Sequence, residues 1–144
     1  MTTRTENTNI YIDTNVLIGA FSDDNRFDSD RECWKYLISL RGKRLFVSSL
    51  SIAQMVALFQ KRFTNQKIKE KILSITAKTN IVDFSEKDIN ASLELADGDM
   101  EDNIQYVLCR KMRCTKFVTK NVKDYGHYLN IEVVTPKKVR TIAM

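Results

Sequence analysis

The sequence predicts an α/β fold, with helices packed against a mostly parallel sheet. Short apolar segments with strand character alternate along the chain with longer segments whose apolar residues recur at helical spacing. The segments between successive strands are long enough to cross over a sheet, and the two-residue turns of antiparallel hairpins are missing. With 144 residues, 4 glycines and 1 proline, the composition favours one domain without a flexible linker.

The strands are predicted from short apolar runs. The first run, "NIYID", ends on an aspartate, and the second, "RLFVSS", ends on two serines. "NIVDFS", "TKFVTK" and "IEVVT" read as strands in the same way. The predicted strands therefore span residues 9–13, 44–49, 80–85, 115–120 and 131–135.

The helices are predicted from apolar spacing and from the residues that begin or end them. The helix periodicity gives spans at residues 16–21, 29–41, 50–62, 66–78, 86–96 and 99–112. Gly42 is placed to end the second helix, Ser49 to cap the third, and Asp99 to open the sixth.

The fifth of these helices carries Ile89, Leu93 and Ala96 on one side, and Gly98 is placed to end it. We therefore expect that side to pack inward.

The charge balance suggests a polyanionic partner without proving one. The formal net charge is +5, with basic segments at residues 61–71, 110–123 and 137–140 and an acidic segment at 97–102. A solvated surface accounts for the basic segments equally well.

Apolar run lengths, the polar N-terminus and the cysteines together suggest where in the cell the protein works. No apolar run reaches the roughly 18 residues of a membrane span, and the polar N-terminus lacks the apolar core of a signal peptide. Cys33, Cys109 and Cys114 have neither zinc spacing nor an even number, so we expect reduced thiols. The expectation is a cytoplasmic domain over residues 9–144 after a disordered lead-in at 1–8.

Acidic and amide side chains follow the predicted strands, at the edge where parallel sheets place functional crevices. Asp13 ends the first strand, Asp124 follows the fourth, and Gln54 lies one turn into the helix after the second. Asp99 and Asp102 are three residues apart at a helix start, so they share a face, which Gln105 continues.

Each aspartate also has a structural explanation when taken alone. Asp99 and Asp102 suit the first turn of a helix, Asp13 can cap the helix that follows it, and Asp124 can be a turn residue. Four carboxylates that met at one edge would repel one another by roughly 4 kcal/mol per close pair. Such a group must protonate in part or bind a cation, and an all-oxygen set favours Mg²⁺ or Mn²⁺.

Another α/β phosphate-handling protein, such as a phosphatase or a receiver-like domain, is the alternative from a different class. It is disfavoured because "DTNVL" lacks the DxD spacing of the aspartate-nucleophile phosphatases. The chain also has no glycine-rich phosphate loop.

Four motifs together resemble the PIN-domain family of metal-dependent ribonucleases, including the toxin halves of VapC-type toxin–antitoxin pairs. They are "YIDTNVLI" at 11–18, "VSSLSIAQ" at 47–54, "DMEDNIQ" at 99–105 and "FVTKNVKDY" at 117–125. The closing "IEVVTPKKV" is similar to the last strand and terminal helix of that family. The resemblance spans nearly the whole chain. It implies a parallel sheet of four to five strands between helices, and one or two Mg²⁺ or Mn²⁺ ions that activate water to hydrolyse RNA.

The resemblance also implies roles for individual residues. The implied metal ligands and catalytic acids are Asp13, Asp99, Asp102 and Asp124. The residues implied to support them are Thr14, Asn15, Ser48, Gln54, Gln105 and Asn121. Lys120 and Lys123, which bracket the acidic edge, are the expected contacts to the RNA backbone. Toxin-type members imply a homodimer and a small antitoxin partner.

Gln54 departs from the pattern, because many PIN domains place a glutamate at the matching position. An amide carries no charge and cannot act as a base, although the extra Asp99 can compensate. The alternative function is therefore a catalytically weakened module that binds RNA or a protein partner without cleaving RNA.

Overall fold

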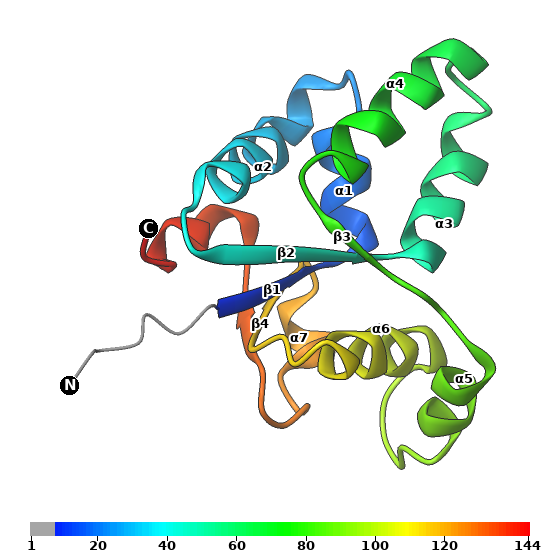
Figure 1. Ribbon diagram of the computed structural model, residues 1–144, viewed down its shortest axis with the longest axis vertical. Helices are drawn as coiled ribbons and strands as arrows, with labels where there is room; N and C mark the ends of the chain where they lie inside the picture. The colour runs from blue at the N-terminus through cyan, green and yellow to red at the C-terminus, as the bar shows by residue number, and fades with distance from the viewer. Residues whose placement is uncertain (1–7) are drawn as a thin grey trace.

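A computed structural model describes residues 8–144 and shows a five-stranded sheet in which all neighbouring strands are parallel (Figure 1). The strands are β1 (Thr8–Ile12), β2 (Lys43–Ser48), β3 (Asn80–Val82), β4 (Lys116–Val118) and β5 (Glu132–Val134). Their order is β3-β2-β1-β4-β5, so the first strand of the chain lies at the centre. The predicted fold class is confirmed. The lead-in predicted for residues 1–8 lies outside the described residues, apart from Thr8, which begins β1.

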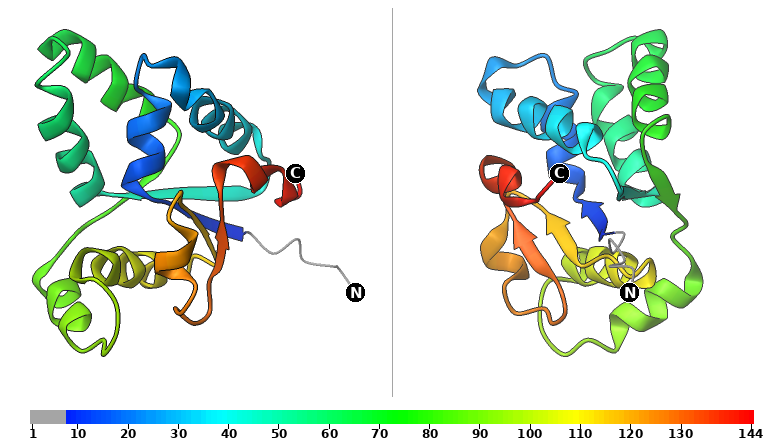
Figure 2. Two further views of the ribbon diagram at one scale, coloured as in Figure 1. Left: turned by 180° about the vertical axis from the view of Figure 1, so that it is seen from behind. Right: turned by 60° about the vertical axis from the view of Figure 1, so that its left-hand side comes forward.

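Helices cover both faces of this sheet. The α-helices are α1 (Thr14–Ala20), α2 (Asp28–Ser39), α3 (Ser49–Phe59), α4 (Asn65–Thr76), α5 (Glu86–Leu93), α6 (Met100–Lys111) and α7 (Val122–Tyr125), and the 3₁₀ helices are η1 (Asn25–Phe27) and η2 (Pro136–Thr141). Helices α1 to α4 lie on one face, and α5 to α7 lie on the other (Figures 1 and 2). Within residues 8–144, no helix combines the length and the apolar character needed to cross a membrane.

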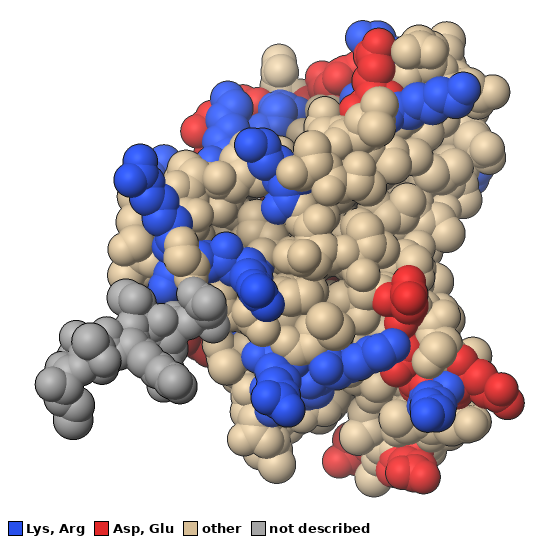
Figure 3. Space-filling view, in the orientation of Figure 1, with Lys and Arg blue, Asp and Glu red and all other residues tan. Residues whose placement is uncertain are grey.

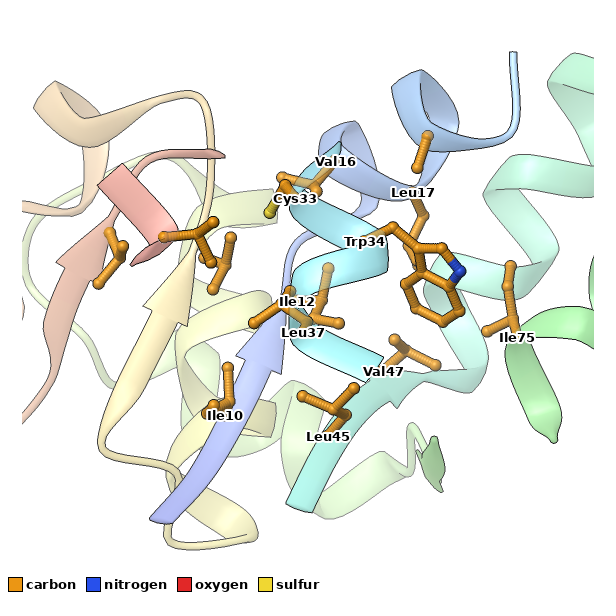
Figure 4. Close-up of a cluster of buried hydrophobic side chains, with 14 of the residues drawn as sticks. Ile10, Ile12, Val16, Leu17, Cys33, Trp34, Leu37, Leu45, Val47 and Ile75 are labelled. Carbon is orange, nitrogen blue, oxygen red and sulfur yellow. The ribbon is translucent and has the colours of Figure 1, made fainter. Parts of the chain in front are cut away.

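Two apolar cores form because successive side chains of a strand point to opposite faces. Ile10 and Ile12 of β1 point into the core beneath α1 to α4, with Leu37 of α2 (Figure 4). Tyr11, between them, points into the core beneath α6, where its ring stacks on Phe117 at 5.2 Å between centroids. The central strand is therefore buried on both faces, as in other parallel sheets.

The strand register brings the ends of β1 and β4 together. Ile12 pairs with Val118, and the backbone amide of Asp13 donates to the Val118 carbonyl over 2.9 Å. Asp13 and Thr119 therefore leave the sheet side by side. On the other side of β1, Tyr11 pairs with Phe46, so β2 ends at the same edge.

The N-cap of α3 is Ser48, not Ser49 as predicted. The Ser48 hydroxyl accepts a hydrogen bond from the Ser51 amide over 2.9 Å, and its own backbone is extended. Ser49 is the first helical residue, and its hydroxyl accepts from the Phe84 amide over 3.0 Å. Either of the two adjacent serines can cap a helix. Ser48 is the cap because it is the last residue of β2, paired with Val82, and its backbone is extended.

The predicted inward face of α5 is wrong. Ile89 is 41% and Leu93 66% exposed, whereas Asp88 and Ser92 are buried. Asp88 turns inward because it completes a capping box with Ser85 and forms an ion pair with Lys111 of α6 at 3.0 Å. Polar bonds therefore set the rotation of this short helix in place of its apolar residues.

The three cysteines are buried free thiols, as the sequence predicted. Cys33 lies in the core beneath α1 to α4, and Cys109 and Cys114 lie in the core beneath α6. They therefore act as small apolar residues in the core.

Candidate active site

A pocket of about 240 Å³ opens at the carboxyl edge of the sheet, where β1 and β4 end. Its walls come from four segments that are far apart in the sequence, namely α1, α3, α6 and the loop into α7. The lining residues are Asp13, Thr14, Asn15, Ile18, Gln54, Glu101, Asp102, Asn121 and Tyr125. Six of these were singled out from the sequence, at the edge where parallel sheets place their ligands.

Asp13 is the most buried acid of this pocket, with 6% of its surface exposed. It caps α1, and its carboxylate accepts hydrogen bonds from the Thr14 amide over 2.7 Å and from the Thr119 hydroxyl over 2.8 Å. Burial raises the pKa of Asp13 to about 6; these hydrogen bonds lower it, and the nearby Asp102 and Glu101 carboxylates raise it. Asp13 therefore carries a charge that its surroundings only partly compensate.

Asp102 lies in the first turn of α6, across the same pocket. The Tyr125 hydroxyl donates to its Oδ1 over 2.9 Å. Burial raises the pKa of Asp102, the hydrogen bond from Tyr125 lowers it, and the Asp99, Asp124 and Glu101 carboxylates raise it. Tyr125 is itself only 2% exposed, so its ring is a core residue and does not stack on a nucleic-acid base.

A buried polar network fixes the floor of the pocket around Thr14. The Thr14 hydroxyl lies 2.6 Å from the Ser51 hydroxyl, which in turn accepts from Ser48 over 2.9 Å. It also contacts Gln54 Oε1 at 3.0 Å and Gln105 Nε2 at 3.5 Å. The network positions the residue that follows Asp13, so Ser48 and Gln105 act at a distance from the pocket surface.

The Tyr11 hydroxyl donates a hydrogen bond to Gln105 Oε1 and so fixes the Gln105 side chain. Both side chains are almost fully buried. Burial raises the pKa of Tyr11 well above its usual range, so the phenol stays protonated and keeps donating.

Thr119 was not singled out from the sequence, although it bonds directly to Asp13. Its hydroxyl also accepts from the Asn121 amide over 3.1 Å and lies 3.4 Å from Asn15 Nδ2. Its position could have identified it, because Thr119 is the first residue after β4 and lies within the motif "FVTKNVKDY". Asn15 and Asn121 both line the pocket.

The acidic residues at the start of α6 have different roles. Asp99 caps the helix, and its Oδ1 accepts from the amides of Glu101 over 2.8 Å and Asp102 over 3.4 Å. Its side chain does not line the pocket, whereas Glu101 does and was missed. The capping role that the sequence allowed for Asp99 is the one observed, and Glu101 and Asp102 are the acids that line the pocket.

Asp124 and Lys123 lie beside the pocket, not in it. Together with Lys120, Asn121 and Val122 they line a neighbouring hollow of about 400 Å³. The charge of Asp124 raises the pKa of Asp102.

The Lys120 ammonium is not free, because it forms an ion pair with Asp30 at 2.8 Å. Lys123 remains exposed, without a carboxylate partner in residues 8–144. On the face shown in Figure 3, Lys and Arg side chains lie at several separate places. We conclude that the basic charge of this face is distributed and does not form a single stripe.

The expected gathering of four carboxylates is therefore corrected to a smaller set. Asp13 and Asp102 share the pocket with Glu101, but no three histidine, cysteine, aspartate or glutamate side chains in residues 8–144 are placed to hold one ion. Two carboxylates still suit Mg²⁺ or Mn²⁺, because these ions bind oxygen and Mg²⁺ keeps several waters. The raised pKa of both acids fits such a cation, which would relieve their repulsion.

Comparison with known proteins points to one family. The family model described as PIN domain matches residues 10–123. The chain is 25% identical over 134 residues to Ribonuclease VapC1 of Aquifex aeolicus (strain VF5), covering 90% of this chain and 91% of that protein. A toxin–antitoxin complex from Klebsiella pneumoniae is similar in structure, with a TM-score of 0.64, 21% identity, and coverage of 88% of this chain and 97% of that one. VapC20 of Mycobacterium tuberculosis, a toxin that cleaves the sarcin–ricin loop, has a TM-score of 0.63, 9% identity, and coverage of 85% and 98%.

The matched residues begin in β1 and continue into α7, so they include Asp13, Asp102, Asn121 and the strands that bring them together. The family match therefore covers the residues that line the pocket, apart from Tyr125. This chain belongs to the PIN domain family.

Proposed function

We propose that this protein is a divalent-metal-dependent endoribonuclease and the toxin half of a toxin–antitoxin pair, acting in the cytoplasm. The observation that carries the proposal is the pair of acids Asp13 and Asp102, which face one pocket with raised pKa values. The similarity to Ribonuclease VapC1 and to the sarcin–ricin-loop-cleaving toxin supports RNA as the substrate. The similarity to a toxin–antitoxin complex supports a small protein partner.

In this proposal Asp13 and Asp102 hold Mg²⁺ or Mn²⁺, and Glu101 and Asn121 are further oxygen donors that line the same pocket. The ion, when bound, polarises the phosphate and lowers the pKa of a water. The chain's own residues prepare this chemistry: Thr119 and the Thr14 amide orient Asp13, and Tyr125 orients Asp102.

Asp99 and Asp124 contribute negative charge from just outside the pocket, which strengthens its attraction for a cation. Lys123 and the basic segments at 61–71 and 137–140 attract the RNA backbone in a salt-dependent, sequence-independent way. The homodimer stays a prediction, and light scattering of the purified protein tests it.

Calorimetric titration with Mn²⁺ and Mg²⁺ is the direct test. We expect saturable binding that Asp102→Asn removes and Asp28→Asn, an exposed acid of α2, leaves intact. Cleavage of a labelled RNA pool with Mn²⁺ should then require both Asp13 and Asp102. Equal cleavage by the wild type and Asp102→Asn would place the activity elsewhere.

A catalytically weakened module that binds RNA or a protein is the second candidate. Gln54 favours it, because its neutral amide occupies the wall of the pocket between the Thr14 hydroxyl at 3.0 Å and Glu101 Oε1 at 3.4 Å. RNA binding without cleavage at saturating Mn²⁺ would establish this candidate and reject the nuclease.

A further inference from the structure

Asp30 is a buried carboxylate outside the candidate active site. It lies in α2, is 2% exposed, and forms an ion pair with the Lys120 ammonium at 2.8 Å. Its other oxygen, Oδ1, is buried and accepts no hydrogen bond from any residue in the range 8–144. Lys120 is therefore the partner that compensates this buried charge.

The fit around Asp30 is close. Gly19 of α1 lies against it, and a Cβ at position 19 would be 2.6 Å from the Asp30 Cγ. The Lys120 ammonium also lies 4.6 Å from the centre of the Phe27 ring of η1. The carboxylate thus lies between Gly19 of α1 and the Lys120 ammonium.

Lys120 connects this buried charge to the pocket. Its neighbour Thr119 donates to Asp13 Oδ2 over 2.8 Å, and the next residue, Asn121, lines the pocket and donates its amide to the Thr119 hydroxyl over 3.1 Å. The Lys120 amide lies 3.4 Å from Asn15 Oδ1. The segment from Thr119 to Asn121 is thus fixed at one side by the pocket and at the other by Asp30.

We propose that Asp30 is a positioning residue of the active site, which holds the Thr119–Asn121 segment through Lys120 and so orients the Thr119 hydroxyl on Asp13. The proposal extends the proposed function, because Asp13 is the acid that this hydroxyl orients. It also gives Lys120 a role other than the RNA contact expected from the sequence. Gly19 is required in this arrangement because a side chain there would displace Asp30.

Two variants break the link from different sides. Asp30→Asn removes the charge that holds Lys120 while keeping the size of the side chain. Gly19→Ala keeps both charges and pushes the Asp30 carboxylate away. The matched control is Asp88→Asn, since Asp88 is a similarly buried acid that pairs with a lysine at 3.0 Å but lies between α5 and α6.

Backbone hydrogen exchange gives a readout that does not depend on metal. We expect the Asn121 amide to exchange several-fold faster in Asp30→Asn and Gly19→Ala, and to be unchanged in Asp88→Asn. Thermal unfolding should show that all three variants fold. Unchanged exchange at Asn121 in both test variants would overturn the proposal.

Mn²⁺ calorimetry links the segment to the acids. We expect Asp30→Asn to bind Mn²⁺ about ten-fold more weakly than the wild type and Asp88→Asn to bind equally well. Because Asp30 acts through Thr119, the Asp30→Asn/Thr119→Val double variant should bind no more weakly than Thr119→Val alone, and additive losses would contradict this route. Absence of Mn²⁺ binding by the wild type would reject the proposed metal site, and the exchange data would then decide the role of Asp30 separately.

Discussion

The Tyr125 hydroxyl donates a 2.9 Å hydrogen bond to the Asp102 carboxylate, and so joins the aromatic core to the acid of α6. The Tyr125 ring packs on Phe117 with 4.3 Å between centroids, which holds the hydroxyl in place. Burial raises the pKa of Tyr125 above its usual range, so the hydroxyl remains a donor at neutral pH. The core thus determines where this carboxylate points.

Removing that hydroxyl should affect the acid more than the fold. In Tyr125→Phe, we expect a stability loss of about 1 kcal/mol. The pKa of Asp102 should rise further, because a hydrogen bond that favours its charged form is lost, and Mn²⁺ binding should weaken about ten-fold.

Tyr106→Phe is the control for this change. Its hydroxyl donates to the Leu129 carbonyl over 2.8 Å in the same aromatic cluster, without contact to either acid. Calorimetry and chemical denaturation of both variants would measure the two effects. Equal Mn²⁺ affinity in the two variants would show that Tyr125 does not orient Asp102.

The raised pKa of Asp13 predicts how stability changes with pH. The folded state binds a proton up to about pH 6, whereas the unfolded aspartate loses it near 3.8, so the folded state binds more protons between these values. The free energy of unfolding contributed by Asp13 therefore falls as pH rises through this window, by up to about 3 kcal/mol.

Asp13→Asn should accordingly make the protein more stable at pH 7 while it removes metal binding. The stabilisation should shrink toward pH 4, where the wild-type carboxyl is protonated as well. Urea denaturation of both proteins at pH 4 and pH 7, without divalent metal, measures the difference. A variant less stable than the wild type at pH 7 would contradict the uncompensated charge of Asp13.

Gln54→Glu should strengthen metal binding and weaken the metal-free protein. The new carboxylate would keep the bond from Thr14, but its other oxygen would replace the amide that lies 3.4 Å from Glu101 Oε1. Without metal, we expect a stability loss of up to about 1 kcal/mol from this repulsion. With Mn²⁺, the added charge should raise the affinity.

Gln60→Glu, at the exposed end of the same helix, is the matched control for Gln54→Glu. Calorimetry should show tighter Mn²⁺ binding only for the change at position 54. If neither change alters the affinity, Gln54 is not what limits the metal site.

Gly98 fixes the turn that leads into Asp99 and α6. Its φ of +93° suits glycine, and a Cβ there would lie 2.7 Å from the Tyr128 hydroxyl and 2.8 Å from Asn103 Oδ1. Gly98→Ala should therefore be destabilising by about 2–4 kcal/mol, from strain and from the displaced pair.

Gly42→Ala separates these two costs. Gly42 has a similar φ of +69°, but a Cβ there would meet nothing within 4 Å, so only the backbone strain of about 1–2 kcal/mol applies. Thermal denaturation of both variants tests this. Equal losses would mean that the Tyr128–Asn103 pair yields without cost.

Local patterns predicted most elements but not the rotation of a short helix. The apolar spacing of residues 86–96 suggested an inward face with Ile89 and Leu93, and both are exposed. The helix instead buries Asp88, because that carboxylate can pair with Lys111 only after α5 and α6 have come together. A contact between residues 23 positions apart is invisible to a pattern that repeats every three or four residues.

Patterns along the chain were enough to predict the alternation of strands and helices, the position of Asp13 at the end of the first strand, and the motifs that carry Asp102, Asn121 and Gln54. These follow from spacing along the chain, which sets backbone conformation locally. Which acids share the pocket depends on how the elements pack together. Asp99 caps α6, Glu101 lines the pocket, and Lys120 forms an ion pair with Asp30. The physical reason is that the pocket and the Lys120–Asp30 pair join residues far apart in the sequence, which meet only when α1, α2 and α6 pack around the sheet.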